Sequence, residues 1–160
     1  MTTKETLEII EQEIKNLFQK LEAQIEITST AEEDGSVSVN VTMAEPQIFI
    51  GENGQTLLEI QHIVRSMLRK ILKEPLWILL DINGYRKSKE IYVKELANST
   101  ADEVALLKKE KELPPMSSAE RRIVHVVIST RADVVSESIG EEPERRIVIR
   151  PASPAGGPKA

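Results

Sequence analysis

The sequence predicts two small α+β domains, each with helices packed against one face of a small sheet. Three observations lead to this fold class. The chain has 160 residues, enough for one ordinary domain or two small ones. Apolar residues switch between helical spacing and strand spacing along the chain. A Leu-Pro-Pro break at 113–115 follows a long helical pattern, which indicates that a second domain begins here or at the helix before it.

The first segment, residues 1–22, is predicted to be an acidic amphipathic helix that starts near Thr3. Its apolar residues recur at steps of three and four residues. Apolar and polar residues then alternate around 25–27 and again around 37–41, with a Glu-Glu-Asp-Gly turn between them at 32–35. This pattern predicts a hairpin of two strands.

The remainder of the first domain contains a glycine turn, a helix and a strand. Residues 46–50 are apolar and strand-like, and the turn at 51–54 follows them. A strong helical periodicity runs from about Thr56 to Leu72, and an apolar strand is expected over 76–82. The order is therefore helix, strand, strand, glycine turn, helix, strand, and we place this domain at residues 23–84.

The second domain is predicted over residues 85–150 and includes its leading helix. Helical spacing runs from Tyr85 to about Lys109. After the proline pair, Ser117 and Glu120 fit a capping box, so a helix should begin here. We expect it to continue to about Thr130, although its β-branched residues also favour a strand.

Two short strands and a tail complete the prediction. The strand candidates are residues 133–138 and 144–150, joined by a Gly-Glu-Glu-Pro turn at 140–143. Residues 151–160 have low complexity and few groups that could pack. We expect this segment to be a disordered tail.

The composition argues against several function classes. The chain contains no cysteine and only two histidines, His62 and His125, which removes thiol chemistry and the common zinc sites. We therefore expect no catalytic residue, no metal and no cofactor, and a protein that is not an enzyme. No run approaches the roughly 18 to 20 apolar residues that span a bilayer, and no secretory signal is visible. We predict a cytoplasmic protein without membrane insertion.

The net charge of −5 is unusual for a nucleic-acid-binding protein, because phosphate binding depends on Lys and Arg. Its distribution changes this interpretation. Residues 1–34 hold nine acidic residues and three lysines. The acidity therefore belongs to one end of the chain, and the rest is available for binding phosphate.

A first candidate site is the G-x-x-G turn formed by Gly51, Glu52, Asn53 and Gly54. Glycine permits positive φ and close approach of a ligand to the backbone. Free amides and the positive end of the following helix attract phosphate. A sugar-phosphate backbone could lie against this turn, while a tight turn without a ligand is the alternative.

The helix after the turn carries a cationic stripe. His62, Arg65, Arg69 and Lys73 follow one another at steps of three and four residues, away from the apolar face. If a nucleic acid were held at the glycine turn, these side chains would lie near its phosphates. An ordinary solvated helix face is the alternative interpretation.

A second candidate site lies on the polar side of the helix predicted at 117–130. Arg121 and His125 are one turn apart there, and Arg122 lies on the same side. A guanidinium and an imidazole at this spacing can donate to one phosphate or sugar, and either plane can stack on a base. Arg145 and Arg146 extend the cationic set near the final strand. A structural Arg and His pair is the alternative.

Two segments resemble a known family. Residues 115–125, Pro-Met-Ser-Ser-Ala-Glu-Arg-Arg-Ile-Val-His, and residues 134–149 resemble the R-three-H domain of the bacterial Jag family, also called SpoIIIJ-associated or KhpB-like proteins. That domain is named for an Arg and a His separated by three residues, here Arg121 and His125. The glycine turn and the segment around it are similar to the KH-like domain of the same family.

The resemblance implies a bacterial protein that binds single-stranded RNA and acts as a post-transcriptional regulator linked to cell-envelope or division physiology. It also admits single-stranded DNA and a small KH-domain protein as partners. Two departures stand out. Family members usually carry a basic residue in the glycine loop, where this chain has Glu52 and Asn53. Longer members have a separate N-terminal domain, where we expect only the acidic helix.

An alternative function is a protein-interaction adaptor that has a KH-like fold but whose loop has lost its affinity for RNA. Glu52 and the acidic first segment motivate this hypothesis, because both oppose phosphate. Strand edges such as residues 133–138 could pair with a protein partner. Loss of RNA binding in solution would favour the adaptor over the RNA-binding protein.

Overall fold

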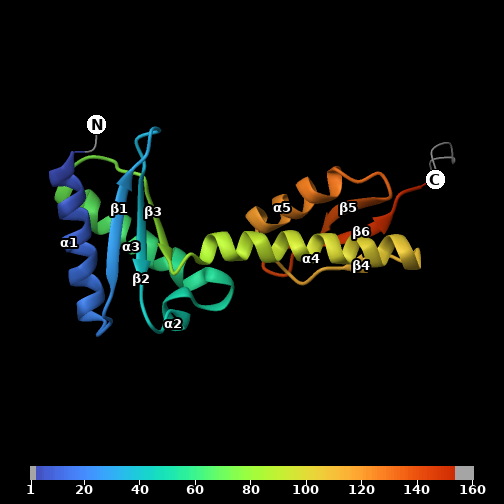
Figure 1. Cartoon of the computed structure of the whole chain (residues 1–160), viewed down its shortest axis with the longest axis horizontal. Helices are drawn as coiled ribbons and strands as arrows, with labels where there is room; N and C mark the ends of the chain where they lie inside the picture. Colours follow the sequence, from blue (N-terminus) through green and yellow to red (C-terminus); the bar gives the residue numbers. More distant parts are fainter. Residues whose placement is uncertain (1–2, 154–160) are drawn as a thin grey trace. The chain divides into compact units, whose positions relative to one another are not determined.

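The computed structural model describes residues 3–153 and divides the chain into two compact units, one ending at Arg86 and the other beginning at Lys87 (Figure 1). Each unit has its own three-stranded sheet and its own hydrophobic core. The predicted fold class of two small α+β domains is confirmed. The division lies inside helix α4 (Tyr85–Leu107), whereas the sequence suggested a boundary after residue 84.

The first unit is built around a mixed sheet. Its elements, in chain order, are α1 (Lys4–Lys20), β1 (Glu26–Ala31), β2 (Val37–Thr42), α2 (Gln47–Ile50), the 3-10 turn η1 (Glu52–Gly54), α3 (Gln55–Leu72) and β3 (Ile78–Ile82). β1 and β2 form the expected antiparallel hairpin, and β3 joins the other side of β2 in parallel. β1 and β3 are therefore the two edge strands.

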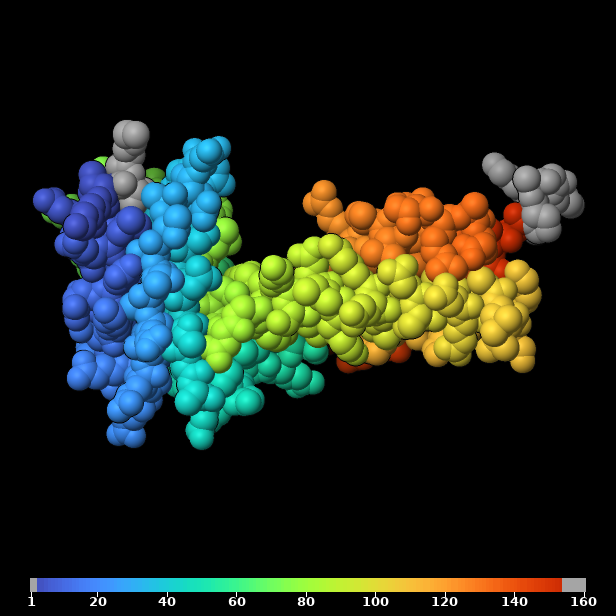
Figure 2. All heavy atoms as spheres, in the orientation of Figure 1, coloured from blue at the N-terminus to red at the C-terminus, as the bar shows by residue number. Residues whose placement is uncertain are grey.

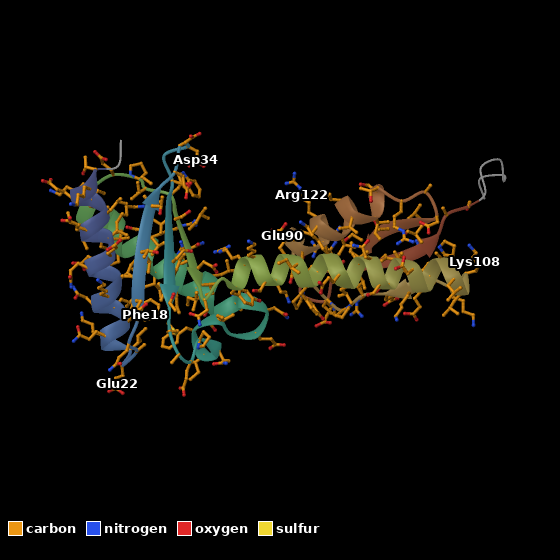
Figure 3. All side chains as sticks on the ribbon, in the orientation of Figure 1. Phe18, Glu22, Asp34, Glu90, Lys108 and Arg122 are labelled. Carbon is orange, nitrogen blue, oxygen red and sulfur yellow. The ribbon has the colours of Figure 1, made fainter. Side chains whose placement is uncertain are left out.

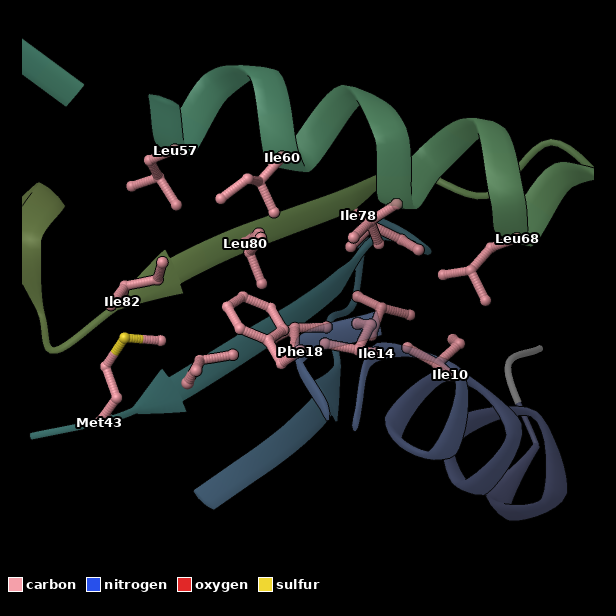
Figure 4. Close-up of a cluster of buried hydrophobic side chains, with 14 residues drawn as sticks. Ile10, Ile14, Phe18, Met43, Leu57, Ile60, Leu68, Ile78, Leu80 and Ile82 are labelled. Atoms are coloured by element: carbon pink, nitrogen blue, oxygen red, sulfur yellow. The ribbon is translucent and has the colours of Figure 1, made fainter. Parts of the chain in front are cut away.

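The core of this unit lies between the sheet and two helices that contact each other, α1 and α3 (Figure 4). α1 contributes a stripe of fully buried residues one turn apart, Ile10, Ile14 and Phe18. One helix is about 10 Å wide and covers roughly two strands spaced about 4.8 Å apart, so a three-stranded sheet requires two helices to cover its apolar face. The helix α1, which lies within the segment that the sequence set apart as residues 1–22, thus packs into the core of the first unit.

The expected strand-like segment at 46–50 is a helix, and this prediction was wrong. Pro46 takes the αR conformation and α2 follows it for a single turn. The Phe49 ring packs against the Phe18 ring of α1, with centroids 5.4 Å apart. A short apolar run does not distinguish a strand from a helical turn. This contact with a residue distant in sequence could not be read from the segment itself.

The second unit combines two helices with an antiparallel sheet. Its elements are the main part of α4, β4 (Lys111–Glu112), α5 (Ser118–Ser129), β5 (Val134–Ile139) and β6 (Arg146–Pro151), with sheet order β4-β6-β5. The two-residue strand β4 was not predicted. β6 runs one residue into the segment expected to be a tail, because Pro151 pairs with Val134. Residues 154–160 of that segment lie outside the described residues.

The start of α5 confirms the capping box. The Glu120 N–H donates to Ser117 Oγ at 3.3 Å, and the Ser117 N–H donates to the Glu120 carboxylate at 2.7 Å. The same carboxylate forms an ion pair with Lys89 of α4 at 3.2 Å. Two backbone donors that the helix leaves unpaired are thereby satisfied. The β-branched residues of this segment do not prevent the helix.

α4 and α5 cover the same face of the second sheet. The buried side of α4 carries residues at helical spacing, Val93, Ala97, Ala101 and Val104. They meet the buried residues of α5 and the inward side chains of the sheet, Val124, Ile128, Val134, Ile147 and Ile149. The opposite side of α5 is left open to solvent.

Candidate nucleic-acid interface

A shallow, open depression of about 420 Å³ lies beside α5 in the second unit. Its lining is mostly polar and cationic: Ser118, Arg121, Arg122, His125, Val126, Ser129, Ser138 and Arg145. Apart from the buried Arg121, the α5 residues among them occur on the helix side that does not pack into the core, and atoms of α5 form an exposed surface of this unit (Figure 2). The structure thus brings four of the five predicted cationic residues of the second domain to one place.

His125 is held by a hydroxyl of the neighbouring strand. Its Nδ1 lies 2.8 Å from Ser136 Oγ of β5. Within the described part of the chain, the other ring nitrogen, Nε2, has no hydrogen-bond partner. The half-buried ring is therefore fixed at one side while its second nitrogen remains able to bind a ligand.

Arg121 is buried, with an exposed fraction of 7%, and its guanidinium is bonded to other residues of the second unit. Its Nη1 donates to the Met116 carbonyl at 2.7 Å, and its Nη2 forms an ion pair with Glu142 at 2.8 Å. These contacts tie the first turn of α5 to the segment before it and to the β5–β6 turn. Arg121 reaches the depression, but its guanidinium already has partners.

Arg122 and Arg145 are the more available cations. Arg122 is exposed and extends away from α5 (Figure 3), and no described residue forms an ion pair or hydrogen bond with its side chain. Arg145 Nε donates to Ser138 Oγ at 3.0 Å, which aims its guanidinium along the depression. Both can donate to phosphate oxygens without breaking an internal ion pair.

Arg146 does not line the depression. It starts β6 and forms ion pairs with Glu112 at 3.6 Å and Glu144 at 3.4 Å. Arg150, four residues on, is similarly paired with Glu110 and Glu137, which raises its pKa. Successive strand residues face opposite sides of a sheet, and both arginines lie on the side away from the buried Ile147 and Ile149.

The glycine turn of the first unit has a structural reason for each glycine. Gly51 and Gly54 have φ of 71° and 79°. A Cβ at Gly51 would lie 2.1 Å from Thr56 Oγ1, and a Cβ at Gly54 would lie 2.7 Å from a ring carbon of Tyr85. Between the glycines, Glu52 and Asn53 are exposed, so a carboxylate lies on the outer surface of the turn.

The residues of the predicted cationic stripe on α3 differ in exposure and in their partners. His62, Arg69 and Lys73 are exposed. Arg65 is half-buried, and its Nε donates to the Ile78 carbonyl of β3 at 2.9 Å. α3 has 18 residues, so at about 1.5 Å per residue the glycine turn and Lys73 stand roughly 27 Å apart. They cannot bind the same phosphate.

Several residues that support these sites were missed from the sequence. Ser136 and Ser138 point toward α5 because they alternate with exposed residues along β5. This alternation was visible in the sequence, but which face meets α5 was not. In residues 3–153 no group of three acidic or histidine side chains could hold a metal ion, and no helix there is long and apolar enough to cross a membrane.

Comparison with known proteins agrees with this architecture. Residues 92–151 match the family model of the R-three-H domain. The chain is similar to the RNA-binding protein KhpB of Clostridium symbiosum, with 32% identity over 89% of this chain and 63% of that protein. The protein of the same name from Bacillus subtilis is 30% identical over 71% of this chain and 56% of its own length.

A third relative, the RNA-binding protein KhpB of Streptococcus pneumoniae serotype 2, is 25% identical over 89% of this chain and 44% of that protein. The chain thus spans less than two thirds of the length of each of these relatives. The two matches over 89% of this chain are long enough to include both units, the glycine turn and the Arg and His pair. Residues 92–151 therefore form an R-three-H domain, and the chain resembles the KhpB-like, or Jag-like, proteins over most of its length.

Proposed function

We propose that the chain binds single-stranded nucleic acid, RNA by preference, at the depression beside α5. The observation that carries this proposal is its lining, which gathers three arginines, a histidine and three serines in one open surface of the second unit. Phosphate and ribose oxygens are acceptors, and these side chains are donors. The names of the relatives, which describe RNA-binding proteins, support RNA as the ligand.

The residues of the depression divide into contacting and positioning roles. Arg122 and Arg145 contact phosphates, because their guanidinium groups have donors to spare. His125 donates or accepts through Nε2 toward a phosphate or a ribose 2′-hydroxyl. Arg121 is a positioning residue that holds the start of α5 and the β5–β6 turn in place.

The first unit supplies a second, weaker contact. The glycine turn with exposed Arg69 and Lys73 offers cations to a strand, while the Glu52 carboxylate repels phosphate at the turn itself. Single-stranded DNA is a second ligand of the same surfaces, because it carries the same phosphates but lacks the 2′-hydroxyl that His125 would recognise.

The test is fluorescence anisotropy of labelled single-stranded RNA at several salt concentrations. Arg122→Ala and Arg145→Ala should weaken binding, and each should reduce the salt slope of log affinity by about 0.7 if one phosphate contact is lost. Arg150→Ala is the matched control, since this arginine is held by two acids on the other side of the sheet. Absence of binding to every homopolymer at low salt would refute the proposal.

We also propose that RNA binding serves post-transcriptional regulation in a bacterium, linked to cell-envelope or division physiology, as the resemblance implies. Sequencing of RNA crosslinked to the tagged protein in cells tests this role. Enrichment of transcripts for envelope or division proteins, lost in the Arg122→Ala and Arg145→Ala double variant, is the expected result. Enrichment that follows transcript abundance alone would contradict it.

A second candidate function is a protein-interaction adaptor. The exposed Glu52 in the turn favours it, because a carboxylate there disfavours phosphate. A groove of about 480 Å³ lined by both apolar and acidic side chains, among them Ile48, Phe49, Glu22 and Glu45, also offers a surface for a protein. Purification of one dominant protein partner, unchanged by RNase treatment, together with no RNA binding would select this function.

A further inference from the structure

The free edge of β3 is closed by side chains of the first unit. Gln61 Oε1 accepts from the Leu80 N–H at 3.0 Å. Arg65 Nε donates to the Ile78 carbonyl at 2.9 Å, and Arg86 Nε donates to the Leu80 carbonyl at 3.1 Å. Backbone groups on an edge strand otherwise attract a partner. The Leu80 N–H is fully engaged, and the side chains of Gln61, Arg65 and Arg86 cover this edge against a further strand.

Directly before this closed edge stands an exposed indole. Trp77 is the single tryptophan of the chain, and 71% of it is exposed. Its backbone is fixed, because the Val37 N–H donates to the Trp77 carbonyl at 2.8 Å. Strand alternation places it on the same side as Leu79, which is 45% exposed, and away from the buried Ile78. Large aromatic side chains are normally buried, so this exposure is informative.

Arg65 fixes one side of the indole. Its guanidinium carbon lies over the Trp77 ring, 5.3 Å from the centroid, while its Nε is anchored on Ile78. One face of the ring is therefore covered by a cation, and the large exposed fraction leaves the other face to solvent. The terminal amino groups of Arg65 have no hydrogen-bond or ion-pair partner among the described residues.

We propose that Trp77 is a nucleobase-stacking residue, and that one base of a bound single strand stacks on its open face. This inference rests on the proposed RNA binding and adds a contact in the first unit, at the end of α3 away from the glycine turn. A base has a flat π face that stacks on an indole whatever its sequence. The Arg65 guanidinium on the opposite face completes a stack of cation, indole and base.

The charges around Trp77 favour a nucleic acid over a protein as the occupant. Arg69 is exposed one turn beyond Arg65 on α3, and Lys73 caps the same helix. A base on Trp77 would bring its own phosphate toward these cations, together with the free amino groups of Arg65. Because the neighbouring edge is already hydrogen-bonded, recognition here consists of stacking and charge, without reading of base edges.

The single tryptophan makes stacking directly observable. Intrinsic fluorescence of the full chain is measured during titration with oligo(U) and oligo(A) RNA, alongside anisotropy of the same labelled strands. Stacking of a base on the indole should quench the emission in parallel with the anisotropy increase. Binding by anisotropy with unchanged emission overturns the stacking site and leaves RNA binding at α5 intact. Absence of binding in both signals refutes the proposed function as well.

Variants separate stacking from general hydrophobic contact. Trp77→Phe keeps a flat ring and should retain most of the affinity. Trp77→Leu keeps apolar area without a π face and should weaken binding roughly 5- to 150-fold, the range expected for loss of one stacked base. The salt slope should change less in either variant than in Arg122→Ala, because no cationic side chain is removed.

Ile48→Ala is the matched control, since Ile48 is 78% exposed in the same unit but offers no ring. Its affinity should equal that of the wild type. Trp77 is exposed, so its variants should fold, which thermal unfolding checks. Equal RNA affinity of Trp77→Leu and the wild type, with both folded, would exclude the stacking role. A Trp77→Phe variant that loses as much RNA affinity as Trp77→Leu would also exclude the stacking role.

Discussion

Arg121 and Arg122 are adjacent in the sequence but lie in different environments. Arg121 is buried, with the Met116 carbonyl and the Glu142 carboxylate as partners, whereas Arg122 is exposed. The helical step of about 100° per residue separates the two side chains. The pair therefore allows a comparison between a residue that we propose positions the site and a residue that we propose contacts the ligand.

We expect Arg121→Ala to lower the free energy of unfolding by about 1–3 kcal/mol, because it leaves buried hydrogen-bonding groups unpaired. Arg122→Ala should change it by less than about 0.5 kcal/mol, as is usual for a surface substitution, while weakening RNA binding. Urea unfolding and anisotropy measure the two properties. Equal stability of both variants would contradict the assigned roles.

Gly54 provides a second comparison at the scale of a residue. Alanine at a positive φ costs roughly 1–2 kcal/mol through the backbone alone. Gly35 has φ of 83°, and a Cβ added there would meet no atom within 4 Å, whereas Gly54 has φ of 79° and the Tyr85 ring at 2.7 Å. Gly54→Ala should therefore destabilise the protein by about 1–3 kcal/mol more than Gly35→Ala, because the site would be overpacked.

Thermal or urea unfolding of the two glycine variants checks this difference. If both lost the same stability, backbone strain would be the whole effect. The turn would then tolerate a side chain at Gly54, and its glycine would have to be explained by contact with a ligand.

At the scale of elements, α5 depends on its first turn. Ser117→Ala removes the side-chain acceptor of the capping box and should cost about 1 kcal/mol of stability. The matched control is Ser129→Ala at the other end of the same helix, where Ser129 Oγ only donates to the Val126 carbonyl. That change should be close to neutral, because alanine is the better helix former. A smaller loss for Ser117→Ala than for Ser129→Ala would contradict the capping assignment.

The segment between α5 and β5 is held by Arg131. Its guanidinium binds Asp133 at 2.7 Å and Asp102 of α4 at 2.6 Å. The hydrogen bonds from Arg131 lower the pKa of Asp133 below its ordinary value of 3.8. A carboxyl with a lowered folded-state pKa contributes stability that is present above the unfolded-state pKa and lost as pH falls through the folded-state value.

We therefore expect the wild type to lose more stability than Asp133→Asn as pH is lowered from neutral to below 3.8. Chemical unfolding at a series of pH values measures the two slopes. The difference should disappear in an Arg131→Ala background, which removes the guanidinium from both proteins. An identical pH dependence of the two proteins would mean that the Arg131 contact contributes nothing to folding.

At the scale of the whole molecule, each unit has its own core and its own set of exposed cations. Two modules that bind one strand raise its affinity above that of either module alone, because the second contact becomes intramolecular. If the proposed RNA binding holds, the acidic residues before position 35 should reduce affinity most at low salt, where charges are least screened.

We expect affinity to rise steeply with RNA length and then level off, as strands become long enough for both units. Trp77→Leu should flatten this rise and leave the affinity for the shortest strands unchanged, if those occupy the α5 depression alone. Anisotropy with a length series measures both curves. A parallel loss at every length would contradict independent contributions from the two units.

Some elements could be predicted from the sequence because local residues determine their conformation, and others could not because contacts with distant residues determine it. The helix at 118–129 followed from its own cap residues, and the buried stripe of α1 from its spacing. The short helix α2 (Gln47–Ile50) did not follow from its own residues, because Phe49 packs against the Phe18 ring of α1. Among the candidate site residues, the cationic character was visible, but Arg146 and Arg145 were indistinguishable until the sheet gave them different partners.

The sequence by itself determined the two-unit α+β organisation, the order of the elements other than α2 and β4, and the cationic and glycine positions, because local periodicity, caps and turn residues encode them. Only the tertiary structure decided which of these cations remain available. Arg65 and Arg121 are engaged by backbone carbonyls, and Arg122 is not. It also revealed the exposed Trp77 beside a closed edge. Such pairings depend on contacts between segments far apart in the chain, which no local pattern records.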